Sequence, residues 1–251
     1  MIGLFDSGVG GLTVLKAIRD VYPSVDVVYF GDTKNAPYGV RSREELSQLT
    51  IEGLRFLINH GADTLVSACN SVSASLAVSI FDVLALPPSQ LIEMVGPCVS
   101  RFKETTARVA LCATSATIES GMYQNAFRMI GKDIQAFAIP DLAGAIERGA
   151  DDGECETYIR DALSGIDSDS YDVLVLGCTH FPLVSALFQK VIGDKNLYDP
   201  AAAVAERILR DFWPREMGYG KTHFYISKES AHFRALVARL FPRDSSIIEL
   251  I

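Results

Sequence analysis

The chain has 251 residues, of which 49% are hydrophobic and 22% charged, so it is long enough for one or two globular domains and is not expected to be disordered. Its net charge of −8 argues against nucleic acid as the main partner, because phosphate backbones are held by a basic surface. The five cysteines are an odd number without a Cys-x-x-Cys pair, and the four histidines are scattered, so neither a disulfide framework nor a metal site is expected.

The N-terminal residues do not have the pattern of a signal peptide, because the apolar run from Ile2 to Phe5 ends at Asp6. No uninterrupted apolar stretch approaches the roughly 18 residues that a membrane-spanning helix needs. We therefore expect a cytoplasmic protein without a membrane partner.

The first expected strand, residues 1–5, leads directly into a glycine-rich turn at residues 6–13 and a helix through residue 20. Such a turn offers backbone N–H groups and the positive end of a helix to an anion. The glycine spacing matches neither G-x-G-x-x-G nor a P-loop, so a carboxylate is as plausible a ligand for this turn as a phosphate. Asp6, at the end of the strand, is well placed for chemistry.

The next expected strand, residues 26–30, is followed by Gly31-Asp32-Thr33 and then by Pro37-Tyr38-Gly39. Taken alone, Pro37-Tyr38-Gly39 favours a simple turn. A helix is expected to start at Ser42 and to run through residue 58. A strand at residues 63–67 then ends just before Cys69, and a helix is expected over residues 71–85. A cysteine next to a helix N-terminus usually has a lowered pKa, which we expect for Cys69.

The second half repeats this alternation of strands and helices. The strand at residues 107–113 is followed by the hydroxyl residues Thr114 and Thr117, and the strand at residues 172–177 by Cys178, Thr179 and His180. The other expected strands span residues 90–95, 134–139, 196–198 and 223–226. Helices are expected over residues 119–129, 142–148, 157–163, 183–191, 201–212 and 229–240, and residues 149–156 are expected to form a loop. Alternation of this kind predicts an α/β fold with parallel sheets.

Two similar stretches carry the strongest functional signal. Each is an Asp-x-Leu-Val strand that ends at a cysteine, Cys69 or Cys178, and the two cysteines are separated by 178 − 69 = 109 positions. Open α/β sheets bind ligands at the carboxyl ends of their strands. Two such thiols, one from each half, are expected to face each other across a cleft.

Together these motifs resemble the glutamate racemases of the cofactor-independent aspartate/glutamate racemase superfamily, over nearly the whole length of the chain. The resemblance rests on residues 5–13, 31–33, 37–39, 68–70 and 177–180, with weaker matches at Thr114, Thr117 and Glu147. It implies two pseudo-symmetric α/β domains with mainly parallel sheets and the active site in the interdomain cleft. The first domain would comprise residues 1–96 plus 206–251, and the second residues 97–205.

The resemblance also implies a chemistry that suits these residues. Racemisation removes the α-proton from one face of an amino acid and returns a proton to the other face, which requires two acid/base groups. By resemblance, Cys69 and Cys178 are these groups, Asp6 assists Cys69, His180 assists Cys178, and Asp32 and Glu147 contribute to the charged surroundings. The implied substrate-binding residues are Ser7, Pro37, Tyr38, Gly39, Asn70, Ser71, Thr114, Thr117 and Thr179.

The implied activity interconverts L- and D-glutamate without a cofactor and supplies D-glutamate for peptidoglycan synthesis. The expected partner is the small amino-acid substrate, in a homodimer that requires no nucleic acid. A one-thiol decarboxylase or isomerase of the same superfamily and a non-catalytic regulator on the same scaffold are the rival interpretations. Retention of both cysteines and of Asp6 argues against them. Cys98, Cys112 and Cys155 are expected to be structural.

Three positions depart from the family pattern. Ser71 stands where threonine is usual, Glu93 where glycine is usual, and Ala143-Gly144 where Val-Pro is common. Smaller residues at 143 and 144 are expected to enlarge the site, and pocket discrimination of one methylene is only about 1–3 kcal/mol. Aspartate is therefore an alternative substrate.

Overall fold

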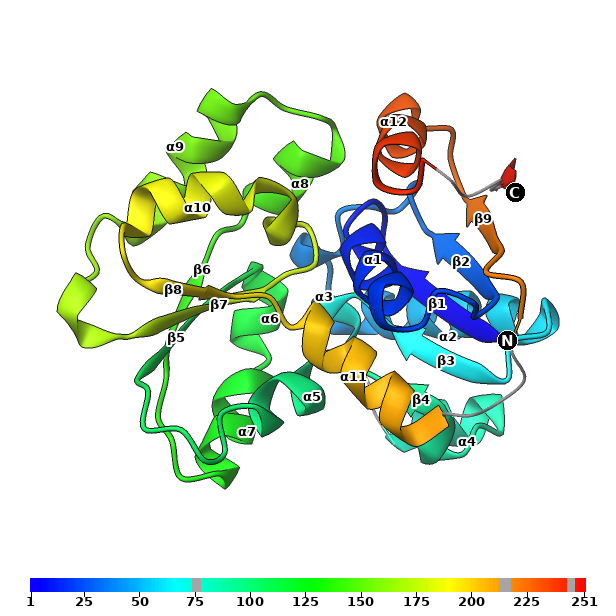
Figure 1. The fold of residues 1–251 in the computed structure, drawn as a ribbon, viewed down its shortest axis with the longest axis horizontal. Coiled ribbons are helices and arrows are strands. Elements are labelled where there is room, and N and C mark those ends of the chain that lie inside the picture. Colours follow the sequence, from blue (N-terminus) through cyan, green and yellow to red (C-terminus); the bar gives the residue numbers. More distant parts are fainter. Residues whose placement is uncertain (74–77, 213–217, 243–246) are drawn as a thin grey trace.

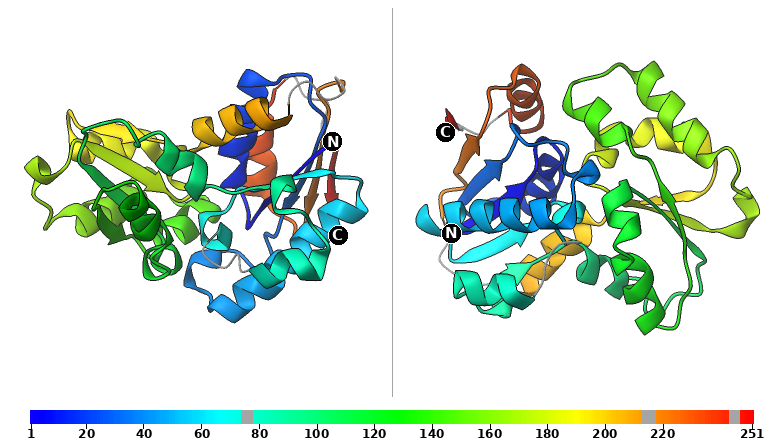
Figure 2. Two further views of the ribbon diagram at one scale, coloured as in Figure 1. Left: turned by 90° about the horizontal axis from the view of Figure 1, so that it is seen from below. Right: turned by 180° about the vertical axis from the view of Figure 1, so that it is seen from behind.

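Two separate sheets organise the chain, and helices cover both faces of each (Figure 1). The computed structural model describes residues 1–73, 78–212, 218–242 and 247–251. Every strand pairing recorded in both sheets is parallel, which confirms the expected α/β class. We call the parts of the chain around the two sheets the first and the second lobe (Figure 2).

The first lobe contains a sheet with the strand order β10-β9-β2-β1-β3-β4. Side chains on these strands alternate between two cores: Leu4 packs on the side of α1, α11 and α12, and Phe5 on the side of α2. The strands are β1 (Ile2–Asp6), β2 (Val27–Gly31), β3 (Thr64–Ser67), β4 (Leu91–Ile92), β9 (Thr222–Ile226) and β10 (Ile247–Leu250). The helices are α1 (Gly11–Val21), α2 (Arg43–Asn59), α3 (Asn70–Ser73), α4 (Val78–Leu84), α11 (Ala201–Phe212) and α12 (Ala231–Leu240).

The second lobe contains a smaller sheet with the strand order β6-β5-β7-β8. Its strands are β5 (Val109–Ala113), β6 (Gln135–Ala138), β7 (Val173–Gly177) and β8 (Asn196–Tyr198). One face packs against α8 (Leu142–Glu147), α9 (Asp152–Leu163) and α10 (Ser185–Ile192), and the other against α5 (Val95–Ser100), α6 (Ser115–Glu119) and α7 (Met122–Met129). Short 3₁₀ turns are η1 (Tyr38–Val40), η2 (Pro88–Gln90), η3 (Ser168–Ser170) and η4 (Phe181–Val184).

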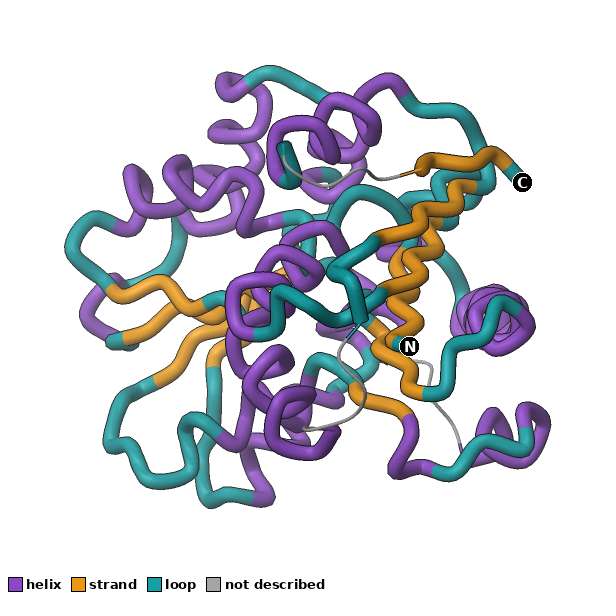
Figure 3. Tube along the Cα trace, turned by 45° about the vertical axis from the view of Figure 1, so that its right-hand side comes forward, coloured by secondary structure: helices purple, strands orange, loops and turns teal. Residues whose placement is uncertain are grey.

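The C-terminal part of the chain returns to the first lobe, where β9 pairs with β2 and β10 forms the sheet edge (Figure 3). The expected division into residues 1–96 plus 206–251 and 97–205 stays a prediction. Its boundary at residue 206 would fall inside α11, a helix that packs against α1.

Local capping explains where the sequence predicted helix starts correctly and where it did not. The predicted start of α2 is confirmed, because Ser42 and Glu45 form a reciprocal capping box. The predicted loop at residues 149–156 is wrong, because α9 already begins at Asp152. There the side chain of Asp151 accepts a hydrogen bond from the Glu154 N–H and caps the helix.

The predicted strand at residues 90–95 is also too long. Only Leu91 and Ile92 pair with β3, and the chain turns into α5 at Val95. The Glu93 carboxylate causes this early turn, since it accepts hydrogen bonds from the N–H groups of Val95 at 2.5 Å and Gly96 at 2.6 Å. This contact gives a local role to the unusual glutamate.

Two further helices differ from expectation, and one strand was missed. The helix expected over residues 119–129 is split into α6 and α7 at Gly121, which has a φ of +67°. The helix expected over residues 71–85 is observed as α3 and α4, and its residues 74–77 lie outside the described residues. The sequence analysis did not predict β10. Among the described residues, no helix is both long and apolar enough to cross a membrane.

Gly3 lets the chain after α2 approach the middle of β1. A Cβ atom at this position would lie 2.6 Å from the Cβ of Ala62. We expect Gly3→Ala to lower the free energy of unfolding by about 1–3 kcal/mol, the usual cost of overpacking a core. Urea denaturation measures this change. Gly165→Ala is the matched control, because a Cβ there has no neighbour within 4 Å among the described residues. Equal stability of the two variants would contradict the prediction.

Candidate active site

The strand ends of the two lobes meet at one small cavity, which we call the inner cavity. Cys69 follows β3 of the first lobe and Cys178 follows β7 of the second, and the two side chains are only 5% and 6% exposed. The residues that line the inner cavity are Ser7, Pro37, Tyr38, Gly39, Cys69, Asn70, Ser71, Thr114, Ala143, Cys178, Thr179 and His180. All of these except Ala143 were predicted as site residues, and Ala143 was singled out as a departure from the family pattern.

The inner cavity is closed. Its volume is about 10 Å³, which is close to the space that one water molecule needs. An amino acid is several times larger, so the lobes or the loop at Pro37 must move before a substrate enters.

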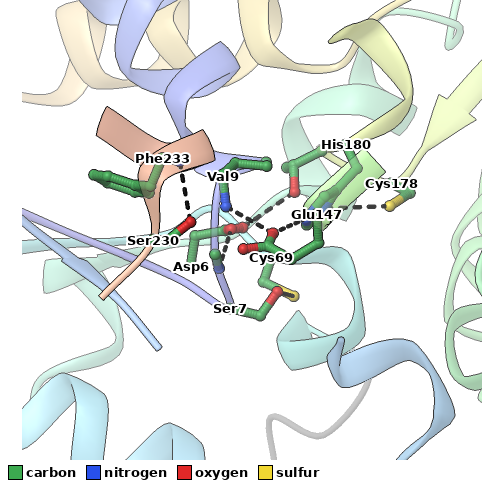
Figure 4. Close-up of polar contacts among 12 residues, drawn as sticks. Asp6, Ser7, Val9, Cys69, Glu147, Cys178, His180, Ser230 and Phe233 are labelled. Carbon is green, nitrogen blue, oxygen red and sulfur yellow. Dashed lines mark hydrogen bonds and ion pairs between the residues drawn. The ribbon is translucent and has the colours of Figure 1, made fainter. Parts of the chain in front are cut away.

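The Cys178 side of the cavity carries a hydrogen-bonded histidine (Figure 4). His180 lies with Nδ1 3.9 Å from the Cys178 sulfur and with Nε2 2.7 Å from Oε2 of Glu147. Burial alone would lower the pKa of His180, but its hydrogen bonds with Cys178 and Glu147 outweigh burial and hold that pKa well above its usual value. His180 therefore places a positive charge beside the Cys178 sulfur.

The Cys69 side of the cavity has the opposite electrostatic character. Burial, reinforced by the negative charge of Asp6, raises the pKa of Cys69 to about 12. The Val72 N–H and the Ser7 hydroxyl, with its Oγ 3.8 Å from the sulfur, only partly offset this. The expected lowering of this pKa by a helix N-terminus is therefore wrong: α3 has only four residues, and burial dominates. At neutral pH Cys69 is a protonated thiol.

Asp6 lies between the two lobes and is fully buried. It accepts hydrogen bonds from the Gly8 N–H at 2.8 Å and from the hydroxyl of Thr179, in the second lobe, at 3.1 Å. Burial raises the pKa of Asp6, whereas the nearby His180 lowers it. Asp6 does not line the inner cavity but touches the residue next to Cys178.

A cluster of hydroxyl groups from Ser71, Thr114 and Thr117 spans the cleft between the lobes. Ser71 Oγ lies 3.0 Å from Thr114 Oγ1 and 3.5 Å from Thr117 Oγ1, so the serine at the unusual position 71 contacts the second lobe. Thr117 is buried behind Thr114 and does not line the cavity.

Asn70 carries a polar group that is ready for a ligand. Its Oδ1 accepts a hydrogen bond from the Tyr123 hydroxyl at 2.6 Å, which fixes the amide orientation. Within the described part of the chain, its Nδ2 is buried without a hydrogen-bond partner. An unpaired buried donor costs free energy, so Nδ2 is a natural partner for a carboxylate in the inner cavity. Tyr123 was missed at the sequence level, because an aromatic residue on the buried face of a helix gives no signal of a polar role.

Asp32 serves a loop rather than the cavity. Its carboxylate accepts hydrogen bonds from the hydroxyls of Tyr38 at 2.7 Å and Ser227 at 2.5 Å, and from Asn35 Nδ2 at 2.9 Å. Burial and Asp32 raise the pKa of Tyr38, so its hydroxyl stays a donor. The geometry makes Asp32 a residue that fixes the Pro37-Tyr38-Gly39 loop. Ser227, just after β9, was missed because its partner is 195 residues away.

Glu147 completes the contacts behind Cys178. Besides His180, its Oε2 also accepts a hydrogen bond from the Val9 N–H of the first lobe at 2.9 Å. The other three cysteines, Cys98, Cys112 and Cys155, are buried in hydrophobic clusters and do not line the cavity. All five cysteines are free thiols. No group of three or more His, Cys, Asp or Glu side chains suited to a metal occurs among the described residues.

Comparison with known proteins gives consistent results. The family model described as Asp/Glu/Hydantoin racemase matches residues 13–208. A glutamate racemase of Aquifex aeolicus (strain VF5) is 38% identical over 241 residues, which covers 94% of this chain and 92% of that protein. A glutamate racemase structure from Bacillus anthracis superimposes with a TM-score of 0.87 at 28% identity, covering 100% of this chain and 97% of that one. The structure from Francisella tularensis in complex with D-glutamate gives a TM-score of 0.87 at 26% identity, with 100% and 96% coverage.

The raised pKa of Cys69 predicts a specific pH dependence of its alkylation. Only the thiolate reacts with iodoacetamide, and with a pKa of about 12 the thiolate fraction grows tenfold per pH unit below that value. We expect the labelling rate of Cys69, followed by peptide mass spectrometry, to rise about tenfold per unit between pH 7 and pH 9. A rate that levels off below pH 9 would contradict this.

Asp6→Asn provides the matched control for this measurement. It removes the negative charge that raises the pKa of Cys69 and keeps the side-chain size. Labelling of Cys69 at pH 7 should therefore be faster in Asp6→Asn than in the unmodified protein.

Proposed function

Because this chain belongs to the Asp/Glu/hydantoin racemase family, it is an isomerase, and we propose that it interconverts L- and D-glutamate by proton transfer between two cysteines. The observation that carries the proposal is that Cys69 and Cys178, from different lobes, line the same inner cavity. The names of the similar proteins favour glutamate as the substrate.

In the proposed mechanism one sulfur removes the α-proton and the other returns a proton to the opposite face. The Cα–H bond breaks as an S–H bond forms on the thiolate, and the S–H bond of the second cysteine breaks as a new Cα–H bond forms. The charge of the pair is unchanged. The resting electrostatics support Cys69 as the starting acid, and the protonated His180 beside Cys178 supports Cys178 as the group that takes the first proton.

Negative charge that develops on the substrate needs stabilisation at the α-carboxylate. The unpaired Nδ2 of Asn70 and the hydroxyls of Ser71 and Thr114 are donors at the wall of the inner cavity. Donors held in place within a closed, water-poor site stabilise such charge more than water does. In this proposal Thr117 supports the hydroxyls of Ser71 and Thr114. Ser7 and Thr179 contact the polar groups of the substrate.

The Pro37-Tyr38-Gly39 loop is proposed to contact the side-chain carboxylate. Ala143 lines the inner cavity and Gly144 does not, so only the smaller residue at 143 bears directly on the space beside the thiols. Because Ala143 leaves more space there than the usual valine, aspartate remains the alternative substrate. The resemblance to glutamate racemases supports a role in supplying D-glutamate for peptidoglycan synthesis in the cytoplasm, and the homodimer stays a prediction.

The test uses purified protein without an added cofactor and follows the optical rotation of each enantiomer. Glutamate should racemise to zero rotation, and Cys69→Ala and Cys178→Ala should each lower the rate by about 10²–10⁴-fold, because each removes an acid/base group. Cys155→Ala, which removes a buried thiol outside the cavity, should keep full activity.

Three outcomes would change the assignment. Rapid racemisation in the absence of either thiol would contradict the two-cysteine mechanism. Failure of the unmodified protein to racemise glutamate would contradict the proposed activity. Turnover of aspartate as fast as glutamate would establish the broader acidic amino-acid racemase instead.

A further inference from the structure

A second and larger cavity lies immediately outside the inner cavity, and we call it the outer cavity. Its volume is about 480 Å³, and Pro37 lines both cavities. Its first-lobe wall comes from the loop at residues 33–40 and from residues 228–230, and its second-lobe wall from residues 140–148. The outer cavity is therefore a cleft between the lobes, next to the closed site.

Pro37 lies between the two cavities, because it lines both of them. A Cβ atom at Gly144 would lie 3.5 Å from Cγ of Pro37, in ordinary van der Waals contact. Glycine leaves this contact unmade. Gly144 lines the outer cavity alone, so the Pro37 loop is the element whose movement would join the two cavities.

Most charged side chains around the outer cavity already have partners. Glu147 is hydrogen-bonded to His180, Arg148 pairs with Glu154, and Glu229 pairs with Arg234. Lys228 and Asp141 remain, and neither has an ion pair recorded within the described ranges. Among the described residues, the cleft thus presents one unpaired cation on the first lobe and one unpaired carboxylate on the second.

We propose that the outer cavity is a docking site in which Lys228 holds an incoming acidic amino acid before the Pro37 loop admits it to the thiols. This inference rests on the proposed function. A free amino dicarboxylate carries carboxylates that suit Lys228 and an ammonium group that suits Asp141. Lys228 acts by attraction and touches none of the reacting atoms.

Lys228 counteracts the net negative charge of the protein at the entrance to the cleft. A net charge of −8 repels an anionic substrate at long range, so a local cation at the entrance raises the substrate concentration where it is needed. Such an exposed charge acts mainly on the association rate, and salt screens it over a Debye length of about 10 Å at 0.1 M.

The test compares Lys228→Met with Lys221→Met at low and high ionic strength. Lys221 precedes β9 and Lys228 follows it, so the two substitutions change the net charge equally at opposite ends of one strand. We expect Lys228→Met to lower kcat/KM for glutamate about threefold to tenfold at low salt, with the loss in KM rather than kcat, and expect the deficit to vanish at high salt. Lys221→Met should match the unmodified protein.

Each other outcome has a distinct meaning. Equal kcat/KM values for the two variants, or a Lys228→Met deficit that persists at high salt, would overturn the docking proposal while glutamate turnover by the unmodified protein still upholds the proposed function. Absence of turnover in the unmodified protein would overturn the proposed function itself.

Discussion

Hydrogen bonds across the cleft hold the two lobes closed on each other, and the rest of the site depends on them. Thr179 donates to Asp6, the Val9 N–H donates to Glu147, and the Tyr123 hydroxyl donates to Asn70. Each contact joins a residue at a strand end or helix of one lobe to a residue of the other. The thiols line one cavity because these contacts are made.

The same contacts keep the inner cavity small. Hydrogen bonds to charged groups typically contribute about 1.5–3 kcal/mol each, and those between neutral groups, such as Tyr123 and Asn70, about 0.5–1.5 kcal/mol. Opening the cleft therefore costs free energy that a bound substrate must offset. In the proposed function, a substrate carboxylate that accepts a hydrogen bond from the buried Nδ2 of Asn70 would supply part of this. Closure therefore has two effects. It positions the thiols, and it keeps the electrostatic effects of Asp6 and His180 strong because little solvent fits beside them.

The sequence predicted which residues line the inner cavity better than it predicted the contacts around them. Strand-end residues such as Cys69 and Cys178 follow buried apolar runs, and that pattern is visible without a structure. Tyr123 and Ser227 were missed because each acts through one contact with a residue far away in the chain. The direction of the Cys69 pKa shift was mispredicted, because local sequence shows the helix but not the burial.

In the fold, too, features that depend on local sequence patterns were predicted, and features that depend on a particular cap or on a distant strand were missed. The parallel α/β pattern was predictable, since buried strands and amphipathic helices have different periods. The start of α9 depends on the cap at Asp151, which the polar run around it concealed. The strand β10 is short and mostly exposed, and it forms only because β9 provides an edge.

The most direct test of the central claim, that two thiols act on opposite faces of one carbon, is the first phase of L-glutamate turnover in heavy water. With two bases, the D-glutamate formed carries deuterium at Cα, while the remaining L-glutamate keeps its α-proton, because each sulfur serves only one face. Mass spectrometry of the separated enantiomers at low conversion measures both. D-glutamate that retains the original proton, or equal deuterium in both enantiomers from the start, would contradict the account.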